Sequence, residues 1–545
     1  MGNRQFLKGA LLLSISMFAT KLLGLLYVIP FQRLVGETGM ALYSYAYVPY
    51  ALFISLSTLG IPVGISKFIS KYNSEGAYDT SRKIFRLSLV FMGFLGLIGF
   101  AALYLMAPWY ARLVLGENGG QVLTVEEVTI AIRMTSYALL IIPPMAIFRG
   151  FFQGNQDMLP TSVSQFAEQF TRITVILLGS YYIIHVLDRS MYEAVSFSVF
   201  AAFIAGVASL GVLTFFWFKN KGKYDTLITQ VRPHEKHSLK KVFPELISYA
   251  VPFAILGLTN NLFQIIDQAT FSPLMMASGV SEQVSTATYG IYVGSLSKMI
   301  MIPVSFAIAF GQPLIPSLTE HVAKKNREGI QKALVLAIQL TCFITIPAVV
   351  GISLLSGPIF TIFVSSTLEP INAMGGQLFG LGAYLGLFMA LYSILVAILQ
   401  GIGKHRDGIK ALGIALIIKL VGNLVLINVF QTNGAIYSTM LAYTYCIVSN
   451  LIIIKKSTGF KMKKLWRRIT PIVVFTGAMA AVVLLVRLGL DQVLSYEGAP
   501  KTAVIYVSVA GSIGALIYFG LCWYFDLLKN LLGMKAPRLR KFKKA

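Results

Sequence analysis

Residues 84–107 read IFRLSLVFMGFLGLIGFAALYLMA, and Arg86 is the only charged residue in this run. A helix needs about 20 mostly apolar residues to cross the hydrocarbon layer of a membrane. The run is also much longer than the roughly 10 alternating residues of a membrane β-strand. This stretch therefore predicts a membrane-spanning helix, and the rest of the chain repeats its pattern.

Fourteen runs of this kind occur in the 545 residues, so the sequence predicts an all-α polytopic membrane protein. The composition agrees, because 56% of the residues are hydrophobic and 12% are charged, against roughly 25% charged residues in a soluble domain. The predicted spans lie near 10–31, 41–66, 84–107, 127–152, 162–186, 191–218, 244–269, 288–312, 331–356, 374–400, 408–431, 434–455, 469–489 and 502–525.

The basic residues predict an orientation for these spans. Most of the 46 Lys and Arg fall at the two ends of the chain and in the loops after even-numbered spans. The loops on the other side hold about five, namely Arg33, Arg112, Arg189, Arg487 and Lys501. Because cytoplasmic loops carry an excess of Lys and Arg, we expect both termini in the cytoplasm. Topology and attraction to anionic lipid then explain the net charge of +24 without nucleic acid as a partner.

Motifs for metal or nucleotide chemistry are missing from the sequence. The three Cys lie in apolar runs without a CxxC pair, and the five His form no HExxH motif. Gly401-Ile402-Gly403-Lys404 lacks the upstream glycine and the Ser or Thr of a P-loop. The sequence therefore predicts no metal, no cofactor and no enzyme activity of the ATPase kind.

Two halves of the chain repeat each other. Lys71 to Gly76 resembles Lys324 to Gly329, Pro108 matches Pro358, Gln153-Gly154 matches Gln400-Gly401, and Arg172 and Lys419 follow nineteen residues after each glutamine. Since each copy holds six spans, both copies share one orientation, which is the parallel kind of repeat. We expect an N-lobe (1–218), a basic cytoplasmic linker (219–243), a C-lobe (244–456), spans 13 and 14 (457–528) and a basic cytoplasmic tail (529–545). Two such lobes are typical of an alternating-access transporter.

Ionisable residues within spans are costly in lipid, so they indicate a polar interior. Lys21 and Lys298 have no acidic neighbour at helical spacing and suit an anionic ligand. Arg149 would line the cytoplasmic mouth of such a cavity, although topology explains it equally well.

Four acidic or amide positions are also candidates. Glu168 and Arg172 are spaced i,i+4, so an ion pair on one helix face is expected. Asp267 follows Asn260 and Asn261 by two turns, which predicts either a polar stripe of hydrogen bonds or a cation site. Coupling to Na⁺ or H⁺ through Asp267 or Glu168 stays open, as does a drive by the membrane potential.

Several stretches resemble a known family. They are Thr20 to Leu25, Ser66 to Asn73, Arg149 to Gly154, and Ser297-Lys298-Met299 through Pro303 to Pro313. The sequence is similar to the multidrug/oligosaccharidyl-lipid/polysaccharide exporter superfamily, and within it to the MurJ-type lipid II flippases of the Gram-positive, YtgP branch. This branch is often labelled polysaccharide biosynthesis or stage V sporulation protein B-like.

The resemblance implies that Lys21 and Lys298 contact the diphosphate of the substrate. Gram-negative members carry an arginine and an aspartate where this chain has Tyr27 and Tyr43. Lys67 or Arg149 is the candidate substitute for that missing charge. Arg172 is a further candidate for binding the substrate.

The function hypothesis is a flippase that moves lipid II, or a similar polyprenyl-diphosphate glycan, to the outer leaflet of the bacterial cytoplasmic membrane. Its expected partners are membrane lipids and the cell-wall synthesis machinery. The alternatives are a flippase for teichoic acid or capsule units, a cation-coupled drug antiporter, a polyprenyl-diphosphate glycosyltransferase, and a structural partner of division proteins. The cationic interior disfavours the antiporter, and the short outward loops disfavour the glycosyltransferase.

Overall fold

The structure is a computed structural model, and it describes residues 20, 23–58, 61–116, 119–229, 251, 254–364 and 368–527 of the chain. Within these ranges the chain forms helices and short turns, without a β-strand. Nine helical stretches of the described chain are long and apolar enough to cross a membrane, and two of them, Val125–Gly154 and Glu369–Gly401, each run through two successive helices. The all-α polytopic fold is therefore confirmed, whereas the count of fourteen spans stays a prediction.

The described chain divides into two compact units. Unit 1 comprises Met1–Lys298 with Lys419–Ala435, and unit 2 comprises Met299–Ile418 with Ile436–Ala545. Residues on both sides of the expected 219–243 linker belong to unit 1. The larger part of that linker lies outside the described residues, and the division into two six-helix lobes stays a prediction.

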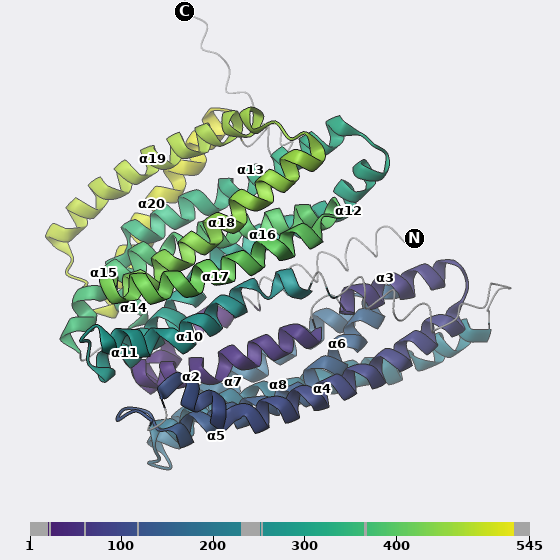
Figure 1. Ribbon diagram of the computed structural model, residues 1–545, viewed down its shortest axis with the longest axis horizontal. Helices are drawn as coiled ribbons and strands as arrows, with labels where there is room; N and C mark the ends of the chain where they lie inside the picture. The colour runs from purple at the N-terminus through teal and green to yellow at the C-terminus, as the bar shows by residue number, and fades with distance from the viewer. Residues whose placement is uncertain are drawn as a thin grey trace, which may run out of the picture. The chain divides into compact units, whose positions relative to one another are not determined.

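Over the described residues, unit 1 includes ten elements with defined bounds before Lys298, and also the end of α17 (His405–Phe430). They are α2 (Val28–Thr58), α3 (Ile61–Ser74), α4 (Tyr78–Leu115), α5 (Val125–Ser136), α6 (Ala138–Gly154), α7 (Leu159–His185), α8 (Met191–Thr229), α10 (Thr259–Ala277), α11 (Glu282–Tyr289) and the π-helix η1 (Gly290–Leu296). Helix α7 packs along α8, and α4 packs against α5 and α6 (Figure 1). Helices α10, α11 and η1 all contact α2. These contacts join α2, near the start of unit 1, to the helices that precede Lys298.

Helix α2 is kinked at Gly36, where φ is 68° and ψ is −173°. Glycine adopts this positive φ without the steric cost that a side chain would bring. The predicted span 41–66 covers the later part of α2, described to Thr58, and the start of α3 from Ile61; residues 59 and 60 lie outside the described residues.

Unit 2 holds most of the remaining helices. They are α12 (Ser297–Ala323) from Met299 onward, α13 (Arg327–Leu354), α14 (Ser356–Phe363), α15 (Glu369–Ala383), α16 (Leu385–Gly401), the first part of α17, most of α18 (Thr432–Thr458), α19 (Met462–Val493) and α20 (Pro500–Tyr524). Helix α19 packs against α13 and α20, and α14 contacts α15 and α20 (Figure 1). The two C-terminal spans therefore pack on the helices of unit 2.

The structure adds a feature to the sequence repeat. The predicted spans 127–152 and 374–400 are each broken into two helices, at Tyr137 and at Tyr384. These two tyrosines are 247 residues apart (384 − 137), which is also the offset between Gln153 and Gln400. Both copies of the repeat therefore place a helix break at the same position.

Large apolar side chains are exposed along several helices. Val90 and Leu105 on α4 are 72% and 74% exposed, and Leu485 on α19 and Leu516 on α20 are 68% and 72% exposed. Contiguous apolar surface of this kind is rare on proteins that face water. Together with the nine long apolar helices, these faces identify a multi-pass membrane protein.

Candidate functional site

The expected ion pair between Glu168 and Arg172 is present, and it is part of a larger cluster. Arg172 Nη2 lies 2.7 Å from Glu168 Oε1, and Arg149 Nη2 lies 2.8 Å from Glu168 Oε2. Arg149 also donates hydrogen bonds to the hydroxyls of Ser164 and Ser209, at 3.2 and 2.9 Å. One carboxylate thus faces two guanidinium groups, and we call Arg149, Glu168 and Arg172 the arginine cluster. It carries one positive charge in excess.

Arg172 is the less completely paired of the two arginines. Its side chain is 20% exposed, whereas its Nε is buried and has no hydrogen-bond partner among the described residues. Four tyrosines lie within electrostatic range of its guanidinium: Tyr27, Tyr43, Tyr47 and Tyr50. We call these four residues the tyrosine cluster.

Lys298 also contacts the tyrosine cluster. The rings of Tyr43 and Tyr47 stack at 5.7 Å, and the rings of Tyr47 and Tyr50 lie 5.7 Å apart. The Tyr27 and Tyr43 hydroxyls are 3.5 Å apart. Lys298 Nζ lies 4.7 Å from the centroid of the Tyr47 ring. Lys298 at the start of α12 and Arg172 within α7 therefore both interact with the tyrosine cluster.

These side chains share a chemistry. An ammonium, a guanidinium and phenol hydroxyls all donate hydrogen bonds, and the first two carry positive charge. The guanidinium matches the geometry of phosphate oxygens, and hydrogen bonds between charged groups are the strong ones. The arrangement around Lys298 and Arg172 is therefore suited to an anion with several oxygens.

Asp267 lies in a different kind of site. Lys419 Nζ is 2.5 Å from Asp267 Oδ1, and Asn423 donates to the same oxygen at 2.9 Å. Tyr292 donates to Asp267 Oδ2 at 3.2 Å. The side chains of Lys419 and Asp267 are 0% and 3% exposed. Asp267 is therefore part of a closed ion pair rather than a stripe with the asparagines of its own helix.

The other predicted site residues lie apart from these two groups or outside the described chain. Asn261 donates to the hydroxyl of Ser55 at 2.9 Å and so links α10 to α2. Asn260 is half-buried, Lys67 is exposed on α3, and Lys21 lies outside the described residues. Over the part of the chain that is described, no three His, Cys, Asp or Glu side chains are grouped as metal ligands.

Sequence reasoning missed the tyrosine cluster and the partner of Asp267. Tyr43, Tyr47 and Tyr50 are spaced i,i+4,i+7, which places them on one helix face and is a usable signal. No local pattern links Asp267 on α10 to Lys419 on α17, because the two helices are far apart in the sequence. The sequence analysis identifies Lys419 only as the repeat counterpart of Arg172.

Comparisons with known proteins identify a family. The family described as "Polysaccharide biosynthesis protein" matches residues 6–322. The lipid II flippase MurJ of Bacillus subtilis (strain 168) is 38% identical over 536 residues, which cover 98% of this chain and 98% of that protein. The stage V sporulation protein B of the same organism is 25% identical and covers 97% of each chain.

Solved structures share the fold. A lipid II flippase MurJ in an inward closed conformation matches with a TM-score of 0.66 at 16% identity, and covers 96% of this chain and 100% of that one. An inward-facing multidrug resistance MATE family transporter of the MOP superfamily matches with a TM-score of 0.65 at 15% identity. That match covers 83% of this chain and 99% of that one. At these identities the likeness concerns the fold alone.

Proposed function

Since this chain belongs to the polysaccharide biosynthesis protein family, we propose that it is a transporter that moves lipid II to the outer leaflet of the membrane. The relative that supports this substrate is the lipid II flippase MurJ, which is similar over almost the whole chain. The substrate's polar part is then a sugar–diphosphate, and its polyprenyl tail remains in lipid. No covalent bond of the substrate changes, so the protein needs a binding site and a conformational change rather than catalytic groups.

The observation that carries the proposal is the contact of Lys298 with Tyr47 in a tyrosine cluster that also interacts electrostatically with Arg172. A diphosphate loses hydration when it enters a protein, and this loss is offset only by charge-assisted hydrogen bonds. Lys298 and Arg172 supply the charge, and the tyrosine hydroxyls supply further donors. Lys21 is the third cation that we assign to the diphosphate, on the family resemblance.

Alternating access requires contacts that close one side of the path. Helices α10, α11 and η1 are joined to the N-terminal part of unit 1 by polar contacts. They are Tyr110–Gln268 (2.6 Å), Tyr45–Ser272 (3.1 Å), Gln32–Ser295 (2.5 Å), and Glu282 with the backbone N–H groups of Gln121 and Val122 (2.9 and 3.0 Å). We assign these contacts to the outer gate. A disulfide between cysteines at 121 and 282 should stop transport and reduction should restore it; transport through the oxidised protein would remove this assignment.

The membrane potential is the drive we propose. Asp267 is paired with Lys419, and Glu168 is paired with two arginines, so both carboxylates already have cationic partners. A diphosphate that moves outward carries negative charge in the direction that an inside-negative potential favours. Each elementary charge gains about 2.3 kcal/mol per 100 mV.

Both termini face the cytoplasm in this proposal, and the host is the bacterial cytoplasmic membrane. The support is the excess of Lys and Arg in the termini and in one set of loops. A cysteine in place of Glu126 should react with an impermeant reagent added outside, and a cysteine in place of Lys456 should not. The reverse labelling would overturn the orientation.

Reconstitution tests the function. The purified chain is placed in vesicles that contain fluorescent lipid II, and a membrane-impermeant quencher reports how fast the lipid changes leaflets. We expect faster exchange than in protein-free vesicles, and net movement toward the positive side under an imposed potassium diffusion potential. A lipid-linked teichoic acid precursor serves as the competing substrate. Exchange of that precursor but not of lipid II would show that the substrate is the teichoic acid precursor instead.

A further inference from the structure

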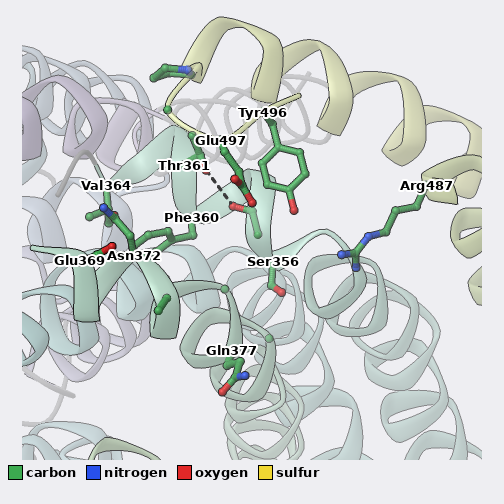
Figure 2. A pocket seen from close by; sticks show the side chains of 16 residues that line it. Ser356, Phe360, Thr361, Val364, Glu369, Asn372, Gln377, Arg487, Tyr496 and Glu497 are labelled. Carbon is green, nitrogen blue, oxygen red and sulfur yellow. Dashed lines mark hydrogen bonds between the residues drawn. The ribbon is translucent and has the colours of Figure 1, made fainter. Parts of the chain in front are cut away.

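Unit 2 contains a cavity of about 730 Å³ that the transport site does not use. Its walls are α14, α15, the end of α19 and the turn that leads into α20. Figure 2 shows Tyr496 and Glu497 reaching from this turn toward α14, with Arg487 on a neighbouring wall. The volume is within the range of about 300–1,000 Å³ that small-molecule sites occupy.

Small residues create the space between α14 and α15. Gly357, Gly376 and Gly380 line the cavity. A Cβ on Gly357 would lie 2.9 Å from the Tyr496 hydroxyl, and a Cβ on Gly376 would lie 3.4 Å from the Gly357 Cα. The sequence pattern at Gly376 and Gly380 is typical of close helix packing. Here the same glycines form part of the cavity lining, together with the Phe360 ring.

The cavity carries many hydrogen-bonding groups. Four of its polar side chains, at Glu369, Asn372, Gln377 and Glu497, are exposed on the rim. Amides donate and accept hydrogen bonds, whereas carboxylates accept them. The rim therefore offers both partners that hydroxyl groups require.

The charge of the cavity disfavours an anion. Two carboxylates, Glu369 and Glu497, line it beside a single guanidinium, that of Arg487. Arg487 already donates to the Leu354 carbonyl at 3.0 Å, and its Nε lies 3.7 Å from an Asp491 oxygen. Phosphate would meet a lining with more negative than positive charge. A neutral ligand with many hydroxyls meets acceptors, donors and the rings of Phe360 and Tyr496.

We infer that this cavity is a saccharide-binding site, separate from the residues that hold the diphosphate. The inference rests on the proposed function in one respect, which is the source of the sugar. In the proposed topology, Glu369 and Glu497 lie on the outer side of the membrane. The glycan of a lipid-linked substrate reaches that side after transport, and the cavity retains its sugar there.

Saturation-transfer NMR with the purified full-length protein tests the inference, with N,N′-diacetylchitobiose as the probe. This neutral disaccharide has acetyl methyl groups that give sharp signals, and it carries neither diphosphate nor lipid. We expect saturation transfer to the wild type, and roughly tenfold weaker binding by the variant Asn372→Ala with Gln377→Ala, because hydrogen bonds are lost. Gln492→Ala is the matched control, since Gln492 is exposed on α19 and does not line the cavity.

A second pair of variants separates this site from transport. Lys298→Ala should leave chitobiose binding unchanged, because Lys298 belongs to unit 1. Absence of saturation transfer to the wild type, or equal binding by the wild type and the Asn372/Gln377 variant, would overturn the saccharide site. Loss of binding in Lys298→Ala would place the sugar at the tyrosine cluster and also overturn it. Lipid II exchange measured on the same samples is a separate readout, so failure of the proposed function is distinguished from failure of this site.

Discussion

Two ionic groups in unit 1 use similar residues in different ways. In the arginine cluster, Glu168 faces two guanidinium groups, and the three side chains are 15–20% exposed. In the other group, Asp267 and Lys419 form a one-to-one pair that is 0–3% exposed. Arg172 and Lys419 occupy equivalent positions in the predicted sequence repeat, so equivalent positions are used in two ways.

The difference concerns how completely each cation is satisfied. Lys419 Nζ contacts Asp267, Asn423 at 3.0 Å and the Ala435 carbonyl at 3.1 Å, which accounts for the three donors of an ammonium group. Arg172 has a surplus of charge around it and an Nε without a partner in the described chain. A buried cation with all its partners supports the fold, whereas a cation in excess is available to a ligand. The arginine cluster is therefore the one we connect with the substrate.

The largest expected effect is the loss of one partner from the closed pair. Lys419→Met leaves the Asp267 carboxylate buried without a counter-charge, which costs about 3–5 kcal/mol. The double variant Lys419→Met with Asp267→Asn buries no charge and should recover much of the lost stability. Folded yield and thermal midpoint, measured by size-exclusion chromatography in detergent, give the comparison.

An exposed pair provides the control for this prediction. Lys332 lies 2.7 Å from Glu328, and both side chains are 76–77% exposed. Because exposed ion pairs contribute little, Lys332→Met should leave folded yield unchanged. Equal stability of Lys419→Met and Lys332→Met would show that the buried pair does not hold the fold.

A smaller and asymmetric effect is expected in the arginine cluster. Glu168→Gln leaves Arg149 and Arg172 facing each other without a carboxylate, at a cost of about 1–3 kcal/mol. Arg172→Gln leaves Glu168 paired with Arg149, so it should fold nearly as well as the wild type and yet transport poorly. The double variant Glu168→Gln with Arg172→Gln should fold better than Glu168→Gln alone and remain inactive.

Transport normalised to folded protein decides between the roles of Arg172. If Arg172→Gln transports lipid II as fast as the wild type, the guanidinium of Arg172 has only a structural role. Poorer folding of the double variant than of Glu168→Gln would contradict the pairing that the 2.7 Å contact indicates.

The smallest effect concerns the ring beneath Lys298. Tyr47→Leu removes a cation–π contact, which is worth about 0.5–2 kcal/mol, so the KM for lipid II should rise by a few-fold. Tyr47→Phe retains the ring and should raise KM less. Tyr181→Leu is the control, because Tyr181 is a 54% exposed tyrosine on α7. A change in KM for Tyr181→Leu as large as that for Tyr47→Leu would deny Tyr47 a specific role.

The sequence predicted the features that depend on neighbouring residues. The predicted span 84–107 lies within α4 (Tyr78–Leu115), because a long apolar run determines a membrane helix locally. The contact between Glu168 and Arg172 was equally predictable, since it needs only one helical turn.

Contacts between distant segments could not be predicted in this way. Lys298 meets Tyr47, and Lys419 meets Asp267, only because helices from different parts of the chain pack together. The second arginine of the cluster, Arg149, comes from α6 rather than α7 for the same reason. Tertiary packing, and not the local sequence pattern, therefore determines which charged side chains are fully paired and which remain in excess.

Direct binding of a polyprenyl diphosphate tests the central claim, that Lys298 and Arg172 hold the diphosphate of the substrate. Native mass spectrometry of the purified chain with undecaprenyl diphosphate should show a complex for the wild type and for Lys298→Arg, which keeps the charge. The double variant Lys298→Ala with Arg172→Gln should lose this complex, while Lys332→Met retains it. Equal occupancy in the double variant and the wild type would contradict the account.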